Sequence, residues 1–259
     1  MDRYIGVDGC KAGWFSACLV PEGGIDFNIF PSLEDLWVEY GDGKSLILVD
    51  IPIGLPSKER QNRKCDTEAR RILGPKRRSS IFAPPCREAL NASCYEEACE
   101  INMGITGRKI SLQAWGIVPK IREMDKFLRQ YSEAHHCIRE SHPEVCFWAM
   151  NGGRSMMYPK KSKQGFAERS RLLKSLLPLS QSIVKTALRK HFKKDVAGDD
   201  VLDALILAAT GFLAEANLCT LPEAPEKDAF GLTMQIVYCS VKLSPAGGCD
   251  RLSHIGEHT

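Results

Sequence analysis

Residues 4–8 of the chain read Tyr4-Ile5-Gly6-Val7-Asp8, a short apolar run that ends on an aspartate. Aromatic and β-branched residues in such a run are typical of a strand. A second run, Ser45-Leu46-Ile47-Leu48-Val49-Asp50, is almost continuously apolar and also ends on an aspartate. Strands that are apolar throughout are typical of the buried centre of a sheet. We therefore expect two central strands, each with one carboxylate at its end.

The segments around these two runs predict a mixed sheet. Residues 14–20 and 25–30 are two further apolar runs, and residues 21–24 between them (Pro-Glu-Gly-Gly) have the chemistry of a hairpin turn. A short helix is expected over residues 32–40, from a Ser N-cap, and a fifth strand over residues 137–141. Two antiparallel links followed by crossover links predict an α/β fold, with a five-stranded mixed sheet and helices on both faces.

The remaining helices are predicted from apolar periodicity and capping residues. The strongest runs from Asp200 to about Ala216, and because it is apolar on all sides we expect it to pack in the core. An extended segment is expected over residues 231–238, and the tail after Ser240 is expected to be frayed. Shorter helices are expected near residues 65–73, 95–102, 119–134, 144–150, 165–176 and 181–191.

The stretch at about 52–118 differs in composition from the predicted sheet segments. It is basic and rich in Pro, Gly and Cys, which predicts a large helical insertion in a single domain of residues 1–240, followed by a flexible tail of residues 241–259. The chain has 11 cysteines without a C-x-x-C pair, which favours reduced and mostly buried thiols. Since it also shows no membrane-spanning run and no export signal, we expect a cytoplasmic protein without membrane contact.

Five carboxylates lie where the predicted strands and the last helix would bring them together. Like charges crowded at strand ends repel one another unless a cation lies between them, and oxygen ligands of this kind suit Mg²⁺ or Mn²⁺. Such ions can bind a phosphodiester and activate a water molecule. Any one of these acids alone would more often form a turn or a cap, and Asp199 is the acid most expected to be a plain N-cap. The five candidate catalytic residues are Asp8, Asp50, Glu144, Asp200 and Asp203.

Two clusters of Lys and Arg, within residues 58–87 and 154–174, stand out although the net charge is only +3. Such clusters can hold phosphates, and they can equally be solvated surface. His142 before Pro143 is interpreted as a turn residue rather than a general base. The candidate substrate-binding residues are Arg70, Arg78, Ser79, Lys160 and Lys161.

Several motifs in this order resemble the bacterial and archaeal domain of unknown function 429 family, over about residues 3–239. They are residues 5–14 (IGVDGCKAGW), 50–56 (DIPIGLP), Cys65-Asp66, Ala69-Arg70, 78–82 (RSSIF), His142-Pro143-Glu144 and Asp199-Asp200-x-x-Asp203-Ala204. The resemblance implies an RNase H-like fold and a predicted nuclease activity. The last motif also resembles the acidic C-terminal helix of Holliday-junction resolvases, which implies that Mg²⁺ would be bound by Asp8, Asp50, Asp200 and Asp203.

Three functions remain open from the sequence: a metal-dependent nuclease, a non-catalytic nucleic-acid-binding module of the same fold, and an enzyme for a small phosphorylated ligand. The pattern Gly6-x-Asp8-Gly9-x-x-x-Gly13 also fits the phosphate loop of actin-like and sugar-kinase ATPases, but those proteins usually duplicate the domain and this chain is short for that. The cysteines and histidines lack the spacing of a zinc site. Nucleic acid is the expected partner, and the oligomeric state stays open, a dimer included.

Overall fold

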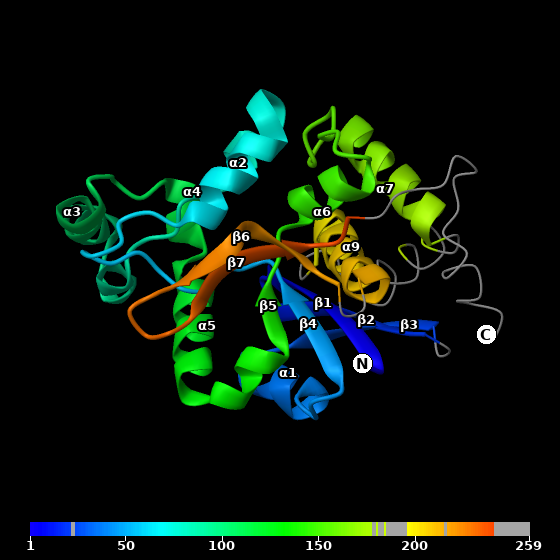
Figure 1. Ribbon diagram of the computed structural model, residues 1–259, viewed down its shortest axis with the longest axis horizontal. Helices are drawn as coiled ribbons and strands as arrows, with labels where there is room; N and C mark the ends of the chain where they lie inside the picture. The colour runs from blue at the N-terminus through cyan, green and yellow to red at the C-terminus, as the bar shows by residue number, and fades with distance from the viewer. Residues whose placement is uncertain (22–23, 178–179, 181–183, 185–195, 215–216, 241–259) are drawn as a thin grey trace.

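A five-stranded mixed sheet forms the centre of the computed structural model, which describes residues 1–21, 24–177, 180, 184, 196–214 and 217–240. The strand order is β3-β2-β1-β4-β5 (Figure 1). β2 is antiparallel to both of its neighbours, whereas β1, β4 and β5 are parallel. The predicted mixed sheet is confirmed. Its strands are β1 (Arg3–Cys10), β2 (Gly13–Val20), β3 (Gly24–Phe30), β4 (Ser45–Val49) and β5 (Ile138–Glu140).

Helices cover both faces of this sheet. Side chains alternate along β1, so Tyr4 belongs to one apolar cluster, whereas Ile5 and Val7 belong to another on the opposite face. The face of Tyr4 packs against α6 (Pro143–Met150), α7 (Lys163–Leu176) and α9 (Gly198–Ala214). The face of Ile5 packs against α1 (Leu33–Tyr40) and α5 (Val118–Gln130). The prediction of helices on both faces is therefore confirmed.

The backbones of β1 and α9 meet at Gly6. A Cβ atom at this position would lie 1.9 Å from the carbonyl oxygen of Ala204 and 2.6 Å from the amide nitrogen of Ala208. Because both atoms belong to the backbone, α9 would have to shift. We expect Gly6→Ala to lower the free energy of unfolding by about 1–3 kcal/mol in urea denaturation. Gly9→Ala is the matched control, since its nearest neighbour is the flexible Lys120 side chain at 3.6 Å, and equal losses would contradict this account.

The chain between β4 and β5 is mostly helical, and it contains the predicted helices near 65–73 and 95–102. The first ends near the predicted position, because Gly74 breaks the helical backbone with φ 64°, and a further short helical turn follows this kink up to Arg77. The helix predicted over 119–134 ends earlier, at Gln130. A short helix at Leu112–Gly116 was not predicted. The elements of this segment besides α5 are α2 (Lys64–Arg77), η1 (Arg78–Ser80), η2 (Arg87–Asn91), α3 (Tyr95–Thr106), α4 (Leu112–Gly116) and η3 (Ser132–His136).

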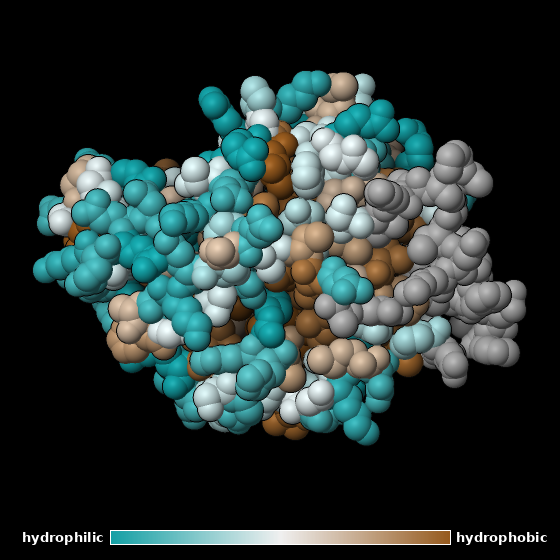
Figure 2. Space-filling view, viewed as in Figure 1, coloured by the Kyte–Doolittle hydropathy of each residue, from teal (hydrophilic) through white to brown (hydrophobic). Residues whose placement is uncertain are grey.

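This segment has an apolar cluster of its own, which includes Cys86, Ala98 and Ile110. Figure 2 shows hydrophilic residues gathered over the side of the molecule that carries α2 and α3, whereas apolar residues reach the surface near the middle of the same face. Basic residues such as Lys64, Arg71 and Arg78 lie on this exposed surface, whereas Arg63 and Arg77 are buried.

A second sheet of two antiparallel strands, β6 (Cys219–Lys227) and β7 (Thr233–Tyr238), follows α9. The extended segment predicted over 231–238 is confirmed as β7. β6 was not predicted because Pro222 and Pro225 lie within it, and proline is disfavoured inside sheets. The helix predicted over 181–191 and the predicted tail at 241–259 lie outside the described residues. Among the residues that are described, no helix is long and apolar enough to cross a membrane.

Candidate metal centre

Two of the predicted acids lie side by side at the ends of the central parallel strands. Asp50 directly follows β4, and Asp8 lies in β1, which continues two residues beyond it. The strands pair Gly6 with Leu48, and the amide of Asp50 donates a hydrogen bond to the carbonyl of Val7 at 2.9 Å. By the alternation of side chains, Asp8 shares a face with Gly6 and Asp50 shares a face with Leu48. Both carboxylates therefore lie on the face that α9 covers.

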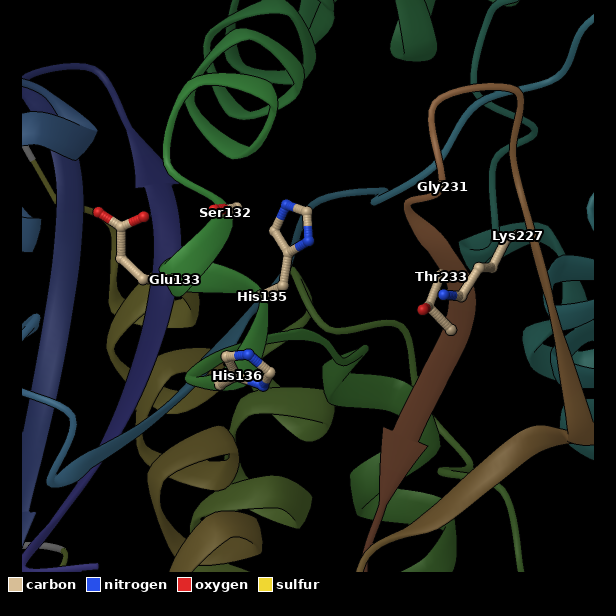
Figure 3. Close-up of a pocket in the computed structure, with 7 residues that line it drawn as sticks. All are labelled: Ser132, Glu133, His135, His136, Lys227, Gly231 and Thr233. Carbon is tan, nitrogen blue, oxygen red and sulfur yellow. The ribbon is translucent and has the colours of Figure 1, made fainter.

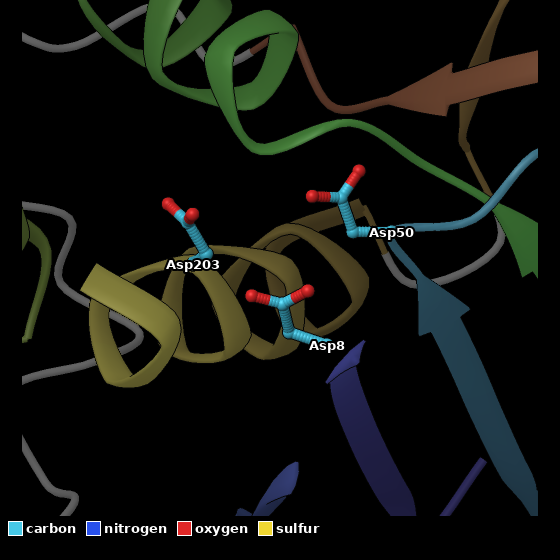
Figure 4. Close-up of side chains that lie close together, drawn as sticks. All are labelled: Asp8, Asp50 and Asp203. Carbon is cyan, nitrogen blue, oxygen red and sulfur yellow. The ribbon is translucent and has the colours of Figure 1, made fainter. Parts of the chain in front are cut away.

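The third carboxylate comes from α9. Leu207 of this helix lies against Gly6, where an added Cβ atom would meet the Leu207 Cβ atom at 2.8 Å. Asp203 precedes Leu207 by one helical turn and so lies on the same face, next to Asp8. One carboxylate oxygen from each of Asp8, Asp50 and Asp203 lies within 4.8 Å of the other two (Figure 4). Asp203 is buried, and the two strand residues are half-buried.

The crowding perturbs the acidity of these groups. Burial, followed by the charges of Asp50 and Asp203, raises the pKa of Asp8 well above its ordinary value, and Lys160 opposes this shift. Burial also raises the pKa of Asp203 to about 6, again against the effect of Lys160. A cation among the three carboxylates would remove the repulsion that causes part of these shifts. The donor set therefore fits a hard divalent cation such as Mg²⁺ or Mn²⁺.

A cation of the chain itself also reaches this cluster. The ammonium nitrogen of Lys160 lies 2.8 Å from Oδ2 of Asp203 and 3.9 Å from Oδ2 of Asp199. Lys160 lies in the segment that connects α6 to α7. The sequence predicted Lys160 as a contact for substrate, whereas the structure places its ammonium group against the acids.

Glu144 lies in the first turn of α6, close enough to Asp203 for its charge to act on that residue. It is paired with the buried guanidinium of Arg169, whose Nε lies 3.1 Å from Oε1 of Glu144. The other carboxylate oxygen, Oε2, is buried, and the described part of the chain offers it no hydrogen-bond partner. The charge of Glu144 contributes to the raised pKa of Asp203, so the two groups are electrostatic neighbours. A role for Glu144 in holding metal or orienting water stays a prediction.

The aspartate that caps the start of α9 is not the one that the sequence predicts. α9 begins at Gly198, so Asp199 belongs to its first turn, and the prediction of Asp199 as the N-cap is wrong. Asp200 makes the capping bond instead, because its Oδ2 accepts a hydrogen bond from the amide of Ala197 at 2.8 Å. This is the reach-back half of a capping box. Asp200 still contributes to the raised pKa of Asp8, and its role as a metal ligand stays a prediction.

The candidate substrate-binding residues fall into two groups. In the first, Arg70 donates from Nε to the carbonyl of Ile81 at 3.0 Å and so supports the chain after η1, while Arg78 and Ser79 are exposed in η1. In the second, Lys161 lies next to Lys160. These two lysines line a hollow of about 320 Å³, together with Ser162, Lys163, Phe166, Gly198 and Asp199.

His142 caps α6, as the turn interpretation predicts. Its Nδ1 atom accepts a hydrogen bond from the amide of Glu144 at 3.2 Å, and its Nε2 atom lies 3.2 Å from the carbonyl of Ser80. The imidazole therefore connects the start of α6 to η1. This role in holding the backbone accounts for a histidine at this position.

A buried ionic cluster near the end of β5 was missed by the sequence analysis. Glu140 is the last residue of β5, and its Oε2 atom accepts hydrogen bonds from Arg63 and from the amide of Ile53, the latter at 2.7 Å. Arg63 also lies 3.3 Å from the carboxylate of Asp66. These bonds connect the loop after Asp50 to β5 and α2. The sequence shows only isolated charges here, because Arg63 and Glu140 are 77 positions apart.

A second hollow of about 650 Å³ lies between η3 and the β6–β7 hairpin. Figure 3 shows the imidazole of His135 on one side and Lys227 and Thr233 on the other, while the carboxylate of Glu133 points away. Nε2 of His135 lies 2.6 Å from the carbonyl of Leu128. None of the residues that line this hollow belongs to the acidic cluster, so the two sites are separate.

The fold and this site define an α/β protein with an acidic cluster at the end of its central strands. The chain matches the family described as Protein of unknown function (DUF429) over residues 6–227, and it therefore belongs to that family. The family resemblance noted in the sequence is confirmed to this extent. No curated protein and no solved structure matches the chain.

Proposed function

We propose that the chain is a divalent-metal-dependent nuclease with an RNase H-like fold. The observation that carries this proposal is the convergence of Asp8, Asp50 and Asp203, with one oxygen of each within 4.8 Å of the others. The mixed five-stranded sheet with helices on both faces is the architecture that the family resemblance implies, and it supports the fold assignment.

The three aspartates would hold Mg²⁺ or Mn²⁺. When bound, such an ion lowers the pKa of a coordinated water and stabilises the leaving oxygen of a phosphodiester. The chain contributes the rigid placement of the ligands, because two of them come from neighbouring strands and the third from a helix whose backbone is in contact with β1 at Gly6. Glu144 is a further buried acid whose charge acts on Asp203, and its Oε2 atom is left to accept a proton or to orient a water.

The proposed substrate is a nucleic acid. Lys161 and Lys163 line a hollow together with Lys160, whose ammonium group pairs with Asp203 of the acidic site, so phosphates bound there would lie beside the carboxylates. Lys side chains contact the phosphate backbone without regard to sequence, and the resulting affinity falls steeply with salt. Arg78, exposed in η1, would add a further contact.

The experiment is hydrolysis of structured and single-stranded DNA and RNA by the full chain, with Mg²⁺ or Mn²⁺ present. We expect metal-dependent cleavage that falls at least about 100-fold in Asp8→Asn, because a ligand is lost. Asp42→Asn is the matched control, since Asp42 is an exposed acid that precedes the opposite end of β4. Equal activity in the wild type and Asp8→Asn would refute the nuclease. Salt-sensitive binding without cleavage would favour the non-catalytic binding module.

A further inference from the structure

We propose that Lys160 is the second cation of this site, so that the chain binds a single divalent metal ion rather than two. The inference rests on the proposed metal site and specifies how it is built. Two-metal sites hold their ions about 3.5–4 Å apart, so that both sides of the phosphodiester meet a positive charge. Here the ammonium group of Lys160 supplies one of those charges from within the chain.

The ammonium group of Lys160 lies in contact with the acidic cluster. It lies 2.8 Å from Oδ2 of Asp203, which is a direct ion pair with the buried ligand of the cluster. It is also close enough to Asp50 and Asp8 for their charges to act on it. A second divalent ion on this side of Asp203 would have to take the same oxygen and lie against a positive charge. Lys160 therefore occupies the place of that ion both sterically and electrostatically.

The backbone around Lys160 is held in place by hydrogen bonds and close packing. The carbonyl of Pro159 accepts hydrogen bonds from the amide and the hydroxyl of Ser162, at 3.0 and 2.8 Å. Gly165 packs so closely on this turn that a Cβ atom there would lie 1.9 Å from the Pro159 carbonyl oxygen. The buried Arg169 donates to the carbonyl of Tyr158 at 3.1 Å. The turn that presents Lys160 is therefore held on both sides, as expected of a built component of a site.

The charge of the three aspartates also favours a single divalent ion. Three ionised aspartates are balanced by one divalent cation and one ammonium group, whereas two divalent cations beside Lys160 would leave an excess of positive charge. Of the neighbouring acids, Glu144 pairs with Arg169, and Asp199 lies further from the ammonium group than Asp203 does, at 3.9 Å. In the reaction, the fixed ammonium would stabilise negative charge that develops on the phosphoryl oxygens, as preorganised cations do.

The test counts bound Mn²⁺ on the full chain by isothermal titration calorimetry and by electron paramagnetic resonance, which distinguishes an isolated ion from a spin-coupled pair. We expect one isolated Mn²⁺ per wild-type chain. In Lys160→Met, which keeps the apolar stem of the side chain and removes the ammonium group, we expect two ions with a coupled spectrum. Lys161→Met is the matched control, because it removes a charge one residue further along, and it should still bind one ion.

The outcomes separate this inference from the function on which it rests. Two Mn²⁺ in the wild type, or a single Mn²⁺ in Lys160→Met, would overturn the role of Lys160 and leave the metal site standing. Absence of Mn²⁺ binding in both proteins would overturn the metal site as well. Should Lys160→Met fail to fold, Lys160→Gln takes its place, because its shorter and neutral side chain also removes the ammonium group, and it too should bind two ions.

Discussion

Asp8→Asn is expected to be more stable than the wild type when metal is removed by a chelator, and less stable when Mn²⁺ is present. Burial and the neighbouring carboxylates raise the pKa of Asp8, which means that its ionised form is unfavourable in the metal-free fold. The isosteric amide removes this repulsion, and substitutions of this kind change the free energy of unfolding by about 1–3 kcal/mol. Saturating Mn²⁺ at about 1,000 times its Kd adds about 4.1 kcal/mol to the wild type alone, which exceeds the gain from the amide.

The pH dependence of this difference has a definite sign. The folded chain holds the proton of Asp8 more tightly than the unfolded chain does, because the pKa is raised on folding. The stability contributed by this group is therefore present below about pH 4 and is lost as the pH rises through the raised pKa. Asparagine does not titrate. In chelator, the advantage of Asp8→Asn should be small near pH 4 and largest at neutral pH and above.

The measurement is urea denaturation of both proteins across this pH range, with chelator and with Mn²⁺. Asp42→Asn is again the control, because Asp42 is exposed and its pKa is lowered, chiefly by a hydrogen bond from the amide of Lys44. We expect no increase in the free energy of unfolding of Asp42→Asn in chelator, and we expect Mn²⁺ to stabilise it as much as it stabilises the wild type. A metal-free Asp8→Asn that is less stable than the wild type would mean that Asp8 has a structural role.

The part of the site that depends on strand periodicity could be predicted from the sequence. Asp8 and Asp50 each follow an apolar run, and two parallel neighbours with the same alternation must place these residues together. Asp203 was predicted with Asp200 because the two are three residues apart on one helix. Which of them turns towards the strands depends on the rotation of α9 about its own axis, and the contact of this helix with Gly6 sets that rotation. The start of the helix was also ambiguous, because Asp199 and Asp200 both lie in its first turn.

The contacts that the sequence could not predict are tertiary contacts. Lys160 lies in an irregular segment without periodicity, so its basic neighbours suggested a phosphate contact, and only packing against α9 brings it to Asp203. Glu140 ends a strand of three residues, too short for an alternation to show that its side chain is buried. β6 carries two prolines, and its pairing with β7 depends on a hairpin that the local sequence disfavours.

The second large effect is expected from Arg63→Met, which should lower the free energy of unfolding by about 3–5 kcal/mol. Arg63 is buried against the carboxylates of Glu140 and Asp66, so its removal leaves two buried acids without their cation. Burial raises the pKa of Glu140 to about 8 even though Arg63 lowers it. The same cluster holds the amide of Ile53, three residues after Asp50, so the variant should also weaken Mn²⁺ binding.

The pH dependence of Arg63→Met shows whether charge burial is the cause. Arg63 lowers the pKa of Glu140, so without the guanidinium the folded pKa lies further above the unfolded value than it does in the wild type. Stability is therefore lost over a wider range of rising pH, and the deficit measured in urea should be larger at about pH 9 than at about pH 5. Glu140→Gln in the Arg63→Met background should recover part of the loss, because one uncompensated charge is removed. Arg60→Met is the matched control, since Arg60 pairs with Glu226 at 2.8 Å while its side chain is 40% exposed. Exposed pairs contribute about 0–1 kcal/mol, so an equal deficit in both variants would contradict the account based on buried charge.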